Sequence, residues 1–541
     1  MKKIFLFMII PAFLFAQFGS QDSGGKLLPG QACYDVKHYD INLTIDPSEK
    51  AIGGSVILTA AAVTDFREMI IDLDTTFTIS DIELLNLPTN SLSYIYSPGK
   101  ILVTFNKEVK AGSSFALAIT YSGSPRIAKN PPWDDGFLWR KTKDNTDWIT
   151  LTCQGGGADI WIPCKDHPGD EPDSVSLRFT YPDNLECIAS GRFISLTDNK
   201  NGTKTSRWFV SNPINNYNIM FYLGPYKPIE YDYTSIAGGK IPFTVWVLPE
   251  NYEKAKAHSV QFLQHMKVNE ELCGPYPFRA DKYAVVETPH LGMEHQTAIA
   301  YGFGWKDDPS FPIDWLHHHE FSHEWFGNLV TVKDWSDFWI HEGIGLYLQP
   351  LYLEKVYGKK EYIEYLRKYK RIANKKPVAP RAELTSGEAY TGDIYNKGAW
   401  IVHTLRYYVG DDAFFKILRR WAYPTEEMER ITDGRQCRNA DTDEMMSIAE
   451  KYSGKKLDWF FEVYLRNAPI PKLHYSIEEG RLVLRWETVN NLPFELPVEV
   501  KSGDKISRVE MKNGKGEITL TNRNDFVIDP DEWILMDLVT K

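Results

Sequence analysis

Two histidines four residues apart, with a glutamate directly after the first, form the most specific chemical pattern in the chain. The segment reads HEFSH from His319 to His323, and Glu342 follows nineteen residues later. Residues four apart share one face of a helix, about 6 Å apart along its axis, so both imidazoles can bind one metal ion. Three protein ligands leave a fourth position of tetrahedral zinc open, as catalytic sites require. We therefore predict one zinc ion per chain, bound by His319, His323 and Glu342, with Glu320 beside its water.

A histidine-rich surface turn is the alternative explanation of this pattern, because His317 and His318 stand directly before it. Neither residue has a histidine four positions later, so only His319 has a partner at metal-ligand spacing. Apolar residues flank the motif and predict a mostly apolar helix over residues 313–330, as a site within a protein core needs. The glycine and third histidine of the metzincin class are not in place.

The composition is typical of a multidomain globular protein. The chain has 541 residues, enough for about three or four domains, and 43% of them are apolar. The formal net charge is −11 and no basic run occurs, so we expect no nucleic acid partner. The six cysteines are too sparse for a disulfide scaffold, although one or two bridges are compatible with an exported protein.

Residues 1–16 have the features of a cleavable secretory signal peptide. They begin with Met1-Lys2-Lys3, continue as an apolar run, and end in small residues with a plausible cut after Ala16. The apolar run is too short for a comfortable membrane span, and no later stretch of about 18 apolar residues occurs. We therefore expect no integral membrane span, and export to the periplasm or the extracellular medium.

Three regions with different patterns follow the signal peptide. Residues 17–228 alternate apolar and polar positions in short runs and predict a β-rich domain. Residues 229–466 combine helical patterns with a strand at 283–287 and contain the zinc motif. Residues 467–541 begin with a proline-containing linker, continue with a hairpin around Glu478-Glu479-Gly480, and predict a small all-β domain.

The zinc motif and several other segments resemble the M1 (gluzincin) family of aminopeptidases. Residues 319–348 are similar to the zinc signature of the family, with eighteen residues between the HExxH pair and the glutamate. Gly292-Met293-Glu294 resembles the GxMEN exopeptidase motif, and residues 395–399 resemble the YxKGA segment. Residues 34–39 look like the first strand of the family, and residues 163–166 resemble its proline-cysteine segment near the substrate. The resemblance covers about residues 30 to 540.

The resemblance implies a fold and a set of catalytic roles. The fold is multidomain α+β: an N-terminal β-sandwich or saddle, a thermolysin-like mixed α/β catalytic domain and a small C-terminal β-sandwich. Glu320 would be the general base and then the general acid of peptide hydrolysis. Tyr395 would stabilise the tetrahedral intermediate, although Tyr390 competes for this role. The cofactor would be a single Zn²⁺.

The resemblance also implies a site for the amino end of a peptide. Glu294 would bind the free amino group, and Gly292 and Met293 would line the substrate pocket beside it. Gln154 is expected to help line the same pocket, because it stands at the family's distance before residue 163. A carboxylate at one residue's length from the metal fixes which peptide bond meets the zinc. The predicted substrates are therefore peptides with a free N-terminus.

The sequence departs from the family at two positions and leaves alternatives open. His295 and His341 stand where asparagines are usual, and we expect them to alter hydrogen bonding and pH dependence around the pocket. The large helical C-terminal domain of many members is not evident, which predicts a more open cleft. A zinc endopeptidase, an additional epoxide hydrolase activity and a non-catalytic zinc-containing peptide-binding protein remain alternatives. The sequence predicts neither the oligomeric state nor the preferred side chain.

Overall fold

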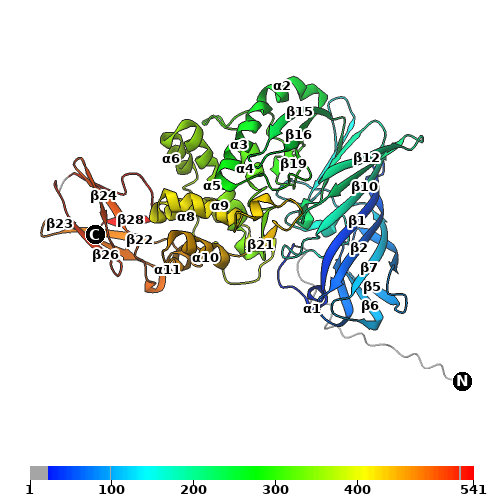
Figure 1. The fold of residues 1–541 in the computed structure, drawn as a ribbon, viewed down its shortest axis with the longest axis horizontal. Helices are drawn as coiled ribbons and strands as arrows, with labels where there is room; N and C mark the ends of the chain where they lie inside the picture. Colours follow the sequence, from blue (N-terminus) through cyan, green and yellow to red (C-terminus); the bar gives the residue numbers. More distant parts are fainter. Residues whose placement is uncertain (1–21, 98, 523–524, 541) are drawn as a thin grey trace.

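The computed structural model describes residues 22–97, 99–522 and 525–540. The predicted signal peptide lies outside these residues. Three parts follow one another along the long axis of the molecule (Figure 1): the N-terminal β-strands at one end, most of the helices in the centre, and a C-terminal β region at the other end. The predicted multidomain α+β fold class is confirmed.

The N-terminal region is built on strands that alternate buried and partly exposed side chains. In β1 (Tyr34–Asp46), Tyr39, Ile41 and Leu43 are buried while their neighbours are partly exposed, as the period of two in a half-buried strand requires. The largest sheet has the order β12-β13-β10-β1-β2-β7-β4, with β1 and β10 parallel and the other neighbours antiparallel. Its other strands are β2 (Ala51–Ala62), β4 (Phe77–Leu84), β7 (Ser114–Gly123), β10 (Ser174–Pro182), β12 (Arg192–Asp198) and β13 (Thr203–Val210).

Two smaller sheets complete this region. A four-stranded sheet has the order β11-β14-β9-β8, and a three-stranded sheet has the order β3-β6-β5. Their strands are β3 (Phe66–Asp72), β5 (Leu92–Ser97), β6 (Lys100–Val109), β8 (Gly136–Lys141), β9 (Asp147–Thr152), β11 (Glu186–Ala189) and β14 (Phe221–Gly224), and a short helix, α1 (Pro29–Ala32), precedes β1. The loop after β9, which begins with Cys153-Gln154, leads towards the catalytic region.

The central region packs helices around a five-stranded sheet of order β15-β16-β17-β19-β18. Strands β16, β17 and β19 are parallel, whereas β15 and β18 are antiparallel edge strands. The strands are β15 (Lys227–Thr234), β16 (Lys240–Val247), β17 (Tyr283–Glu287), β18 (Gly292–Met293) and β19 (Ile299–Tyr301), with a separate parallel pair β20 (Val330–Val332) and β21 (Arg438–Ala440). The helices are α2 (Tyr252–His258), α3 (Phe262–Cys273), α4 (Trp315–Ser322), α5 (Trp339–Tyr357), α6 (Lys359–Lys368), α7 (Ser386–Ala389), α8 (Gly392–Val409), α9 (Asp411–Ala422), α10 (Thr442–Ser453) and α11 (Asp458–Tyr464).

The C-terminal region consists of two small sheets, ordered β26-β23-β22-β28 and β25-β24-β27. Tyr475 of the first sheet packs edge-on against Phe526 of the second, with ring centroids 6.0 Å apart. The predicted hairpin joins β22 to β23 through Glu479 and Gly480, both with positive φ, as a tight two-residue turn requires. The strands are β22 (Lys472–Glu478), β23 (Arg481–Glu487), β24 (Val498–Ser502), β25 (Lys505–Val509), β26 (Lys515–Thr519), β27 (Phe526–Ile528) and β28 (Asp537–Thr540).

This C-terminal region is attached to the last turns of α8. The amide of Leu535 donates a 3.0 Å hydrogen bond to Oγ1 of Thr404, and Nε2 of His403 lies 3.0 Å from the carbonyl oxygen of Glu532. The indole of Trp533 stacks on the ring of His403, with centroids 4.8 Å apart. One helix of the catalytic region therefore supports the C-terminal domain.

Two further observations concern the cysteines and the membrane. All six cysteines lie within the described residues, and none is bonded to another. Among the described helices, none combines the length and the apolar character needed to cross a bilayer.

Candidate active site

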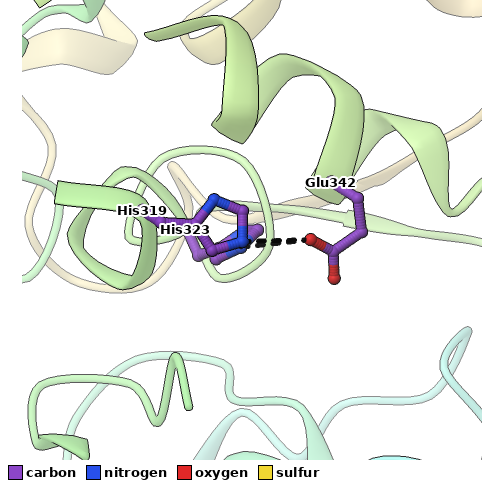
Figure 2. Close-up of side chains that lie close together, drawn as sticks. All are labelled: His319, His323 and Glu342. Atoms are coloured by element: carbon purple, nitrogen blue, oxygen red, sulfur yellow. Dashed lines mark hydrogen bonds and ion pairs between the residues drawn. The ribbon is translucent and has the colours of Figure 1, made fainter. Parts of the chain in front are cut away.

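Three side chains from α4, its C-terminal cap and α5 converge on one point (Figure 2). The Nε2 atoms of His319 and His323 are 3.3 Å apart, and they lie 3.4 and 3.5 Å from Oε2 of Glu342. Zinc bonds of about 2.0–2.1 Å in a tetrahedron place ligand atoms roughly 3.3–3.4 Å apart. The Oε2 atom is buried and has no hydrogen-bond partner among the described residues, as an atom that binds a metal would. The cluster therefore fits one zinc ion.

The helix that carries the histidines is shorter than the sequence suggests. The prediction of a helix over residues 313–330 is wrong, because α4 ends at Ser322. Gly327, with φ of +148°, turns the chain towards β20 in a conformation that favours glycine. His323 keeps helical backbone angles as the C-cap residue, so its spacing to His319 is preserved.

Backbone contacts set the orientation of the second histidine. Nδ1 of His323 lies 2.9 Å from the carbonyl oxygen of Phe326, which makes Nδ1 the protonated nitrogen and leaves the Nε2 lone pair for the metal. A Cβ atom on Gly345 would lie 3.0 Å from Cε1 of the same ring. The imidazole is thus held by a hydrogen bond on one side, and on the other side it packs closely against Gly345.

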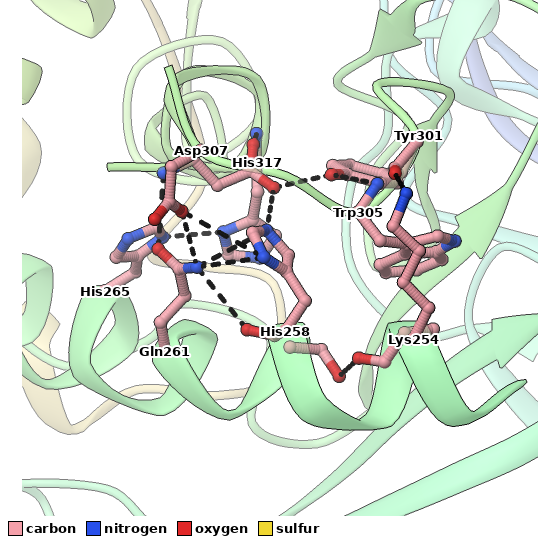
Figure 3. Close-up of polar contacts among 12 residues, drawn as sticks. Lys254, His258, Gln261, His265, Tyr301, Trp305, Asp307 and His317 are labelled. Carbon is pink, nitrogen blue, oxygen red and sulfur yellow. Dashed lines mark hydrogen bonds and ion pairs between the residues drawn. The ribbon is translucent and has the colours of Figure 1, made fainter. Parts of the chain in front are cut away.

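A buried polar network holds the start of α4 (Figure 3). Asp314 is the N-cap: its Oδ1 accepts a 3.0 Å hydrogen bond from the amide of His317, and its Oδ2 accepts one of 2.6 Å from the hydroxyl of Tyr301. The Nε2 atom of His258 lies 2.8 Å from the same Oδ2. The ring of His317 meets that of His265, with Nδ1 atoms 2.8 Å apart. Both histidines before the motif are fully buried, so the alternative of a surface turn is wrong.

Glycines bring two catalytic helices together. A Cβ atom on Gly343 in α5 would lie 2.9 Å from Cα of Gly398 in α8, so no larger residue fits at this crossing. Tyr395 lies one turn before Gly398, and its ring centroid is 6.0 Å from that of His319. Its hydroxyl is 3.5 Å from that of Tyr390, which is 44% exposed. The close crossing thus places the more buried of the two phenols beside the zinc ligands.

The edge strand β18 passes directly over Glu320. A Cβ atom on Gly292 would lie 2.7 Å both from Oε1 of Glu320 and from Cδ1 of Leu316. The Glu320 side chain is 6% exposed and lines the same cavity as the zinc ligands. Glycine at position 292 therefore provides the space in which the Glu320 carboxylate lies.

Glu294 follows β18 and is held by two side chains of the N-terminal region. Its Oε1 accepts hydrogen bonds from Nε2 of Gln154 at 2.5 Å and from the hydroxyl of Tyr217 at 2.8 Å. Its backbone carbonyl accepts a 3.0 Å hydrogen bond from the side-chain Nδ2 of Asn328, which lies just beyond the zinc helix. The side chain and the backbone of Glu294 are thus fixed by groups from three separate parts of the chain.

All nine predicted site residues line one cavity of about 490 Å³. Its wall includes the three zinc ligands together with the catalytic and substrate-binding candidates Gln154, Gly292, Met293, Glu294, Glu320 and Tyr395. The individual roles of these residues stay predictions. Among the described residues, no lysine or arginine lines the cavity, whereas five carboxylates do.

Burial and neighbouring charges set the protonation of the site. Burial raises the pKa of Glu320 well above its usual value, and the charge of Glu294 adds to this effect, as suits a proton acceptor. Burial alone would raise the pKa of Glu342, but the neighbouring imidazoles of His323 and His319 lower it, which favours the ionised carboxylate that a metal ligand needs. Burial raises the pKa of Tyr395, which keeps its hydroxyl protonated and able to donate.

Several residues singled out in the sequence lie outside the wall of the cavity. Residues 163–166 do not line the cavity, because Lys165 turns into the N-terminal core, where its Nζ lies 2.8 Å from the carboxylate of Asp170. His295 and His341 are fully buried and do not line the cavity either. Burial lowers the pKa of His341 to about 3 and that of His295 well below its usual value, so neither titrates near neutral pH.

Sequence reasoning missed several residues of the site. Tyr217, which binds Glu294, lies in a polar run at residues 215–218 whose amides also bond to the backbone of Gly327 and to Asn328, each at 2.7 Å. Such a run among apolar neighbours could have been recognised as an interface. Asp22 and Trp133 also line the cavity, but no local pattern marks them.

An HExxH pair, a glutamate from the next long helix and a mixed sheet beside them form an arrangement typical of zinc metallopeptidase catalytic domains. Residues 313–464 match the peptidase family M1 domain. The resemblance seen in the sequence is thus confirmed by a match over residues 313–464.

Curated relatives have similar sequences over their shared length. The chain is 24% identical to leukotriene A-4 hydrolase of Xenopus laevis, over 64% of this chain and 55% of that protein. It is 22% identical to leucyl aminopeptidase of Saccharolobus solfataricus, over 74% of this chain and 51% of that protein. It is 24% identical to aminopeptidase B of Mus musculus, over 62% of this chain and 51% of that protein. The chain thus spans about half the length of the curated relatives that it matches.

Solved structures share the fold. An M1 zinc metallopeptidase from Deinococcus radiodurans superposes with a TM-score of 0.67 at 22% identity, over 83% of this chain and 96% of that one. A variant of an M1 zinc metallopeptidase from the same organism, bound to a Tyr-Ser-Ala substrate, superposes with a TM-score of 0.66 over 82% and 98%. This likeness concerns the fold alone.

Proposed function

We propose that the protein is a zinc aminopeptidase that removes the N-terminal residue from peptides with a free amino group. The observation that carries this proposal is the buried carboxylate of Glu294, which lines the same cavity as the zinc ligands. The hydrogen bonds from Gln154 and Tyr217 both go to Oε1, so Oε2 is the oxygen that can meet a ligand. The site therefore has an anion in place for a cationic group of a substrate.

A peptide's amino terminus supplies that cation. Its pKa is near 8, so most of it is charged at neutral pH. A hydrogen bond to a charged group contributes roughly 1.5–3 kcal/mol. Because Glu294 is fixed relative to the zinc ligands, it also selects which carbonyl comes to lie beside Glu320. An anchored amino end would thus place the first peptide bond at the zinc.

The residues of the chain then share the proton transfers. Zinc, when bound by the three ligands, lowers the pKa of a water and polarises a carbonyl group. Glu320 accepts the proton of the attacking water and returns it to the departing amine. The Tyr395 hydroxyl, kept protonated by burial, donates a hydrogen bond to the carbonyl oxygen as negative charge develops on it.

A matched pair of substrates tests the proposal. Hydrolysis of a leucyl peptide would be compared with that of its N-acetylated form, with chelator and with zinc added back. Substrates with other first residues would be included, so that narrow specificity is not mistaken for inactivity. We expect cleavage of the free peptides alone, lost with chelator and restored by zinc.

The variant Glu294→Gln should raise the KM of the free peptide by about ten- to a hundredfold, because the charged hydrogen bond is lost. Glu364→Gln, on the exposed face of α6, serves as the control. Equal cleavage of free and acetylated peptides would support an endopeptidase instead. Binding of one zinc without any cleavage would support a peptide-binding protein.

We also propose that residues 1–16 are a signal peptide, which directs export and is then removed, and that the protein acts in the periplasm or outside the cell. The basic start and the short apolar run support this. N-terminal sequencing of the exported protein should begin at Gln17, and a protein that retains Met1 would contradict the proposal.

A further inference from the structure

Residues 22–25, here named the strap, lie at the junction of the N-terminal and catalytic regions. The strap pairs with the start of α7: Gly25 donates a backbone hydrogen bond of 3.0 Å to the carbonyl of Leu384, and Ser386 donates one of 2.9 Å to the carbonyl of Ser23. The amide of Ser23 donates a 2.8 Å bond to the carbonyl oxygen of Gly155, in the loop after β9. The strap therefore joins two segments that are more than 200 positions apart in the sequence.

The strap can lie in this position only with a glycine at residue 24. A Cβ atom on Gly24 would lie 2.5 Å from Cδ1 of Trp335, and the residue has a φ of +78°. The indole Nε1 of Trp335 also lies 3.3 Å from Oγ of Ser23. Any side chain at position 24 must therefore displace the strap from the indole of a fully buried tryptophan.

The loop that the strap holds would otherwise have little rigidity. Gly155, Gly156 and Gly157 follow one another, and each lacks the side chain that restricts a backbone. The carbonyl of Gly155 accepts bonds from the Ser23 amide and from the Ser386 hydroxyl, while the amide of Gly156 donates to Asp135. These external bonds keep the loop in one conformation.

The same loop begins with Gln154, whose amide binds Glu294 Oε1 at 2.5 Å. Asp22, Gly155 and Ser386 themselves line the cavity beside these two residues. The strap is therefore hydrogen-bonded to Gly155, the residue that directly follows Gln154. Gln154 would in turn orient Glu294 for the substrate's amino end.

We propose that the strap is a positioning element of the peptide site, which fixes Gln154 and thereby the Glu294 carboxylate for binding the substrate's amino group. This inference rests on the aminopeptidase function proposed above. A loop fixed before binding avoids the ordering cost that a mobile loop adds to each binding event. The strap thus acts on the binding of the substrate and product, and the proton transfers at Glu320 do not depend on it.

Gly24→Ala in the full chain tests the proposal, with Gly238→Ala as the control. Gly238 has a φ of +82° but nothing within 4 Å of its Cβ position, so it reproduces the backbone strain without displacing the strap. A chain that begins at Lys26 is the second variant. For each protein we would measure kcat and KM for a leucyl peptide, inhibition by free leucine, zinc content and thermal unfolding.

We expect KM and the inhibition constant of leucine to rise together by roughly five- to tenfold in both strap variants, as for a binding site that has lost its preorganisation. The kcat value should stay within about threefold and the zinc content at one per chain, and Gly238→Ala should match the parent.

An unchanged KM in the strap variants of an active parent would overturn this inference alone. A fall in kcat with KM unchanged would overturn it as well, since binding would then be unaffected. Failure of both strap variants to fold would assign the strap to stability and reject the positioning role. A parent that cleaves no peptide would reject the proposed function and this inference with it.

Discussion

Replacing Gly292 by alanine should impair catalysis without removing the metal. The new methyl carbon would lie 2.7 Å from Oε1 of Glu320 and from Cδ1 of Leu316. Both atoms are ends of flexible side chains, so they can move aside, and the fold should lose little stability. The carboxylate must shift by about 0.7 Å to reach the 3.4 Å of an ordinary contact.

A misplacement of about 1 Å can slow an enzyme by roughly a hundredfold. We therefore expect Gly292→Ala to lower kcat by about ten- to a hundredfold, equivalent to roughly 1.4–2.7 kcal/mol in the barrier. Steady-state kinetics on a leucyl peptide would be read beside zinc content and thermal unfolding. Gly392→Ala is the control, because nothing lies within 4 Å of its Cβ position. A kcat within twofold of the parent in Gly292→Ala would refute the placement of Glu320.

Two further predictions concern the phenols and a half-buried acid. Tyr395→Phe should lower kcat by about 10²–10³-fold with little change in KM, as for loss of an oxyanion donor. The kcat of Tyr390→Phe should stay within about threefold of the parent. Equal losses of kcat in the two variants would contradict the role given to Tyr395. Burial raises the pKa of Glu171 to about 8 from 4.5, so its contribution to stability is complete below pH 4.5 and is lost as pH rises through 8. Urea unfolding should therefore find Glu171→Gln more stable than the parent at pH 8.5, by on the order of 1–3 kcal/mol, but not at pH 4.5. A gain independent of pH would count against this explanation.

The parts of the site that the sequence predicts are those set by local spacing. His319 and His323 are four residues apart on consecutive helical backbone, so their joint position follows from helix geometry. Strands such as residues 34–46 and 283–287 follow equally from alternation or from short apolar runs. The cofactor follows from the ligand types.

The parts that the sequence does not predict depend on contacts between distant segments. Tyr217 meets Glu294 only because the N-terminal sheets pack against the catalytic region. The end of α4 does not follow from the apolar pattern, because apolar residues continue past Ser322, whereas the turn at Gly327 follows the helix in the structure. A histidine such as His295 ordinarily titrates near neutral pH, but its ionisation depends on burial, which sequence position does not reveal.

The helix α8 connects the catalytic centre to the C-terminal domain. Tyr395 is in its first turn, and Thr404, nine residues later and about 13 Å along the axis, binds the backbone of Leu535. Because a hydrogen-bonded helix moves largely as a rigid rod, a displacement at one end is passed to the other. The helix that carries Tyr395 is therefore also the helix on which the C-terminal β-sandwich is docked. A change in how the C-terminal domain docks on α8 would then be seen as a change in the rate of peptide hydrolysis proposed above.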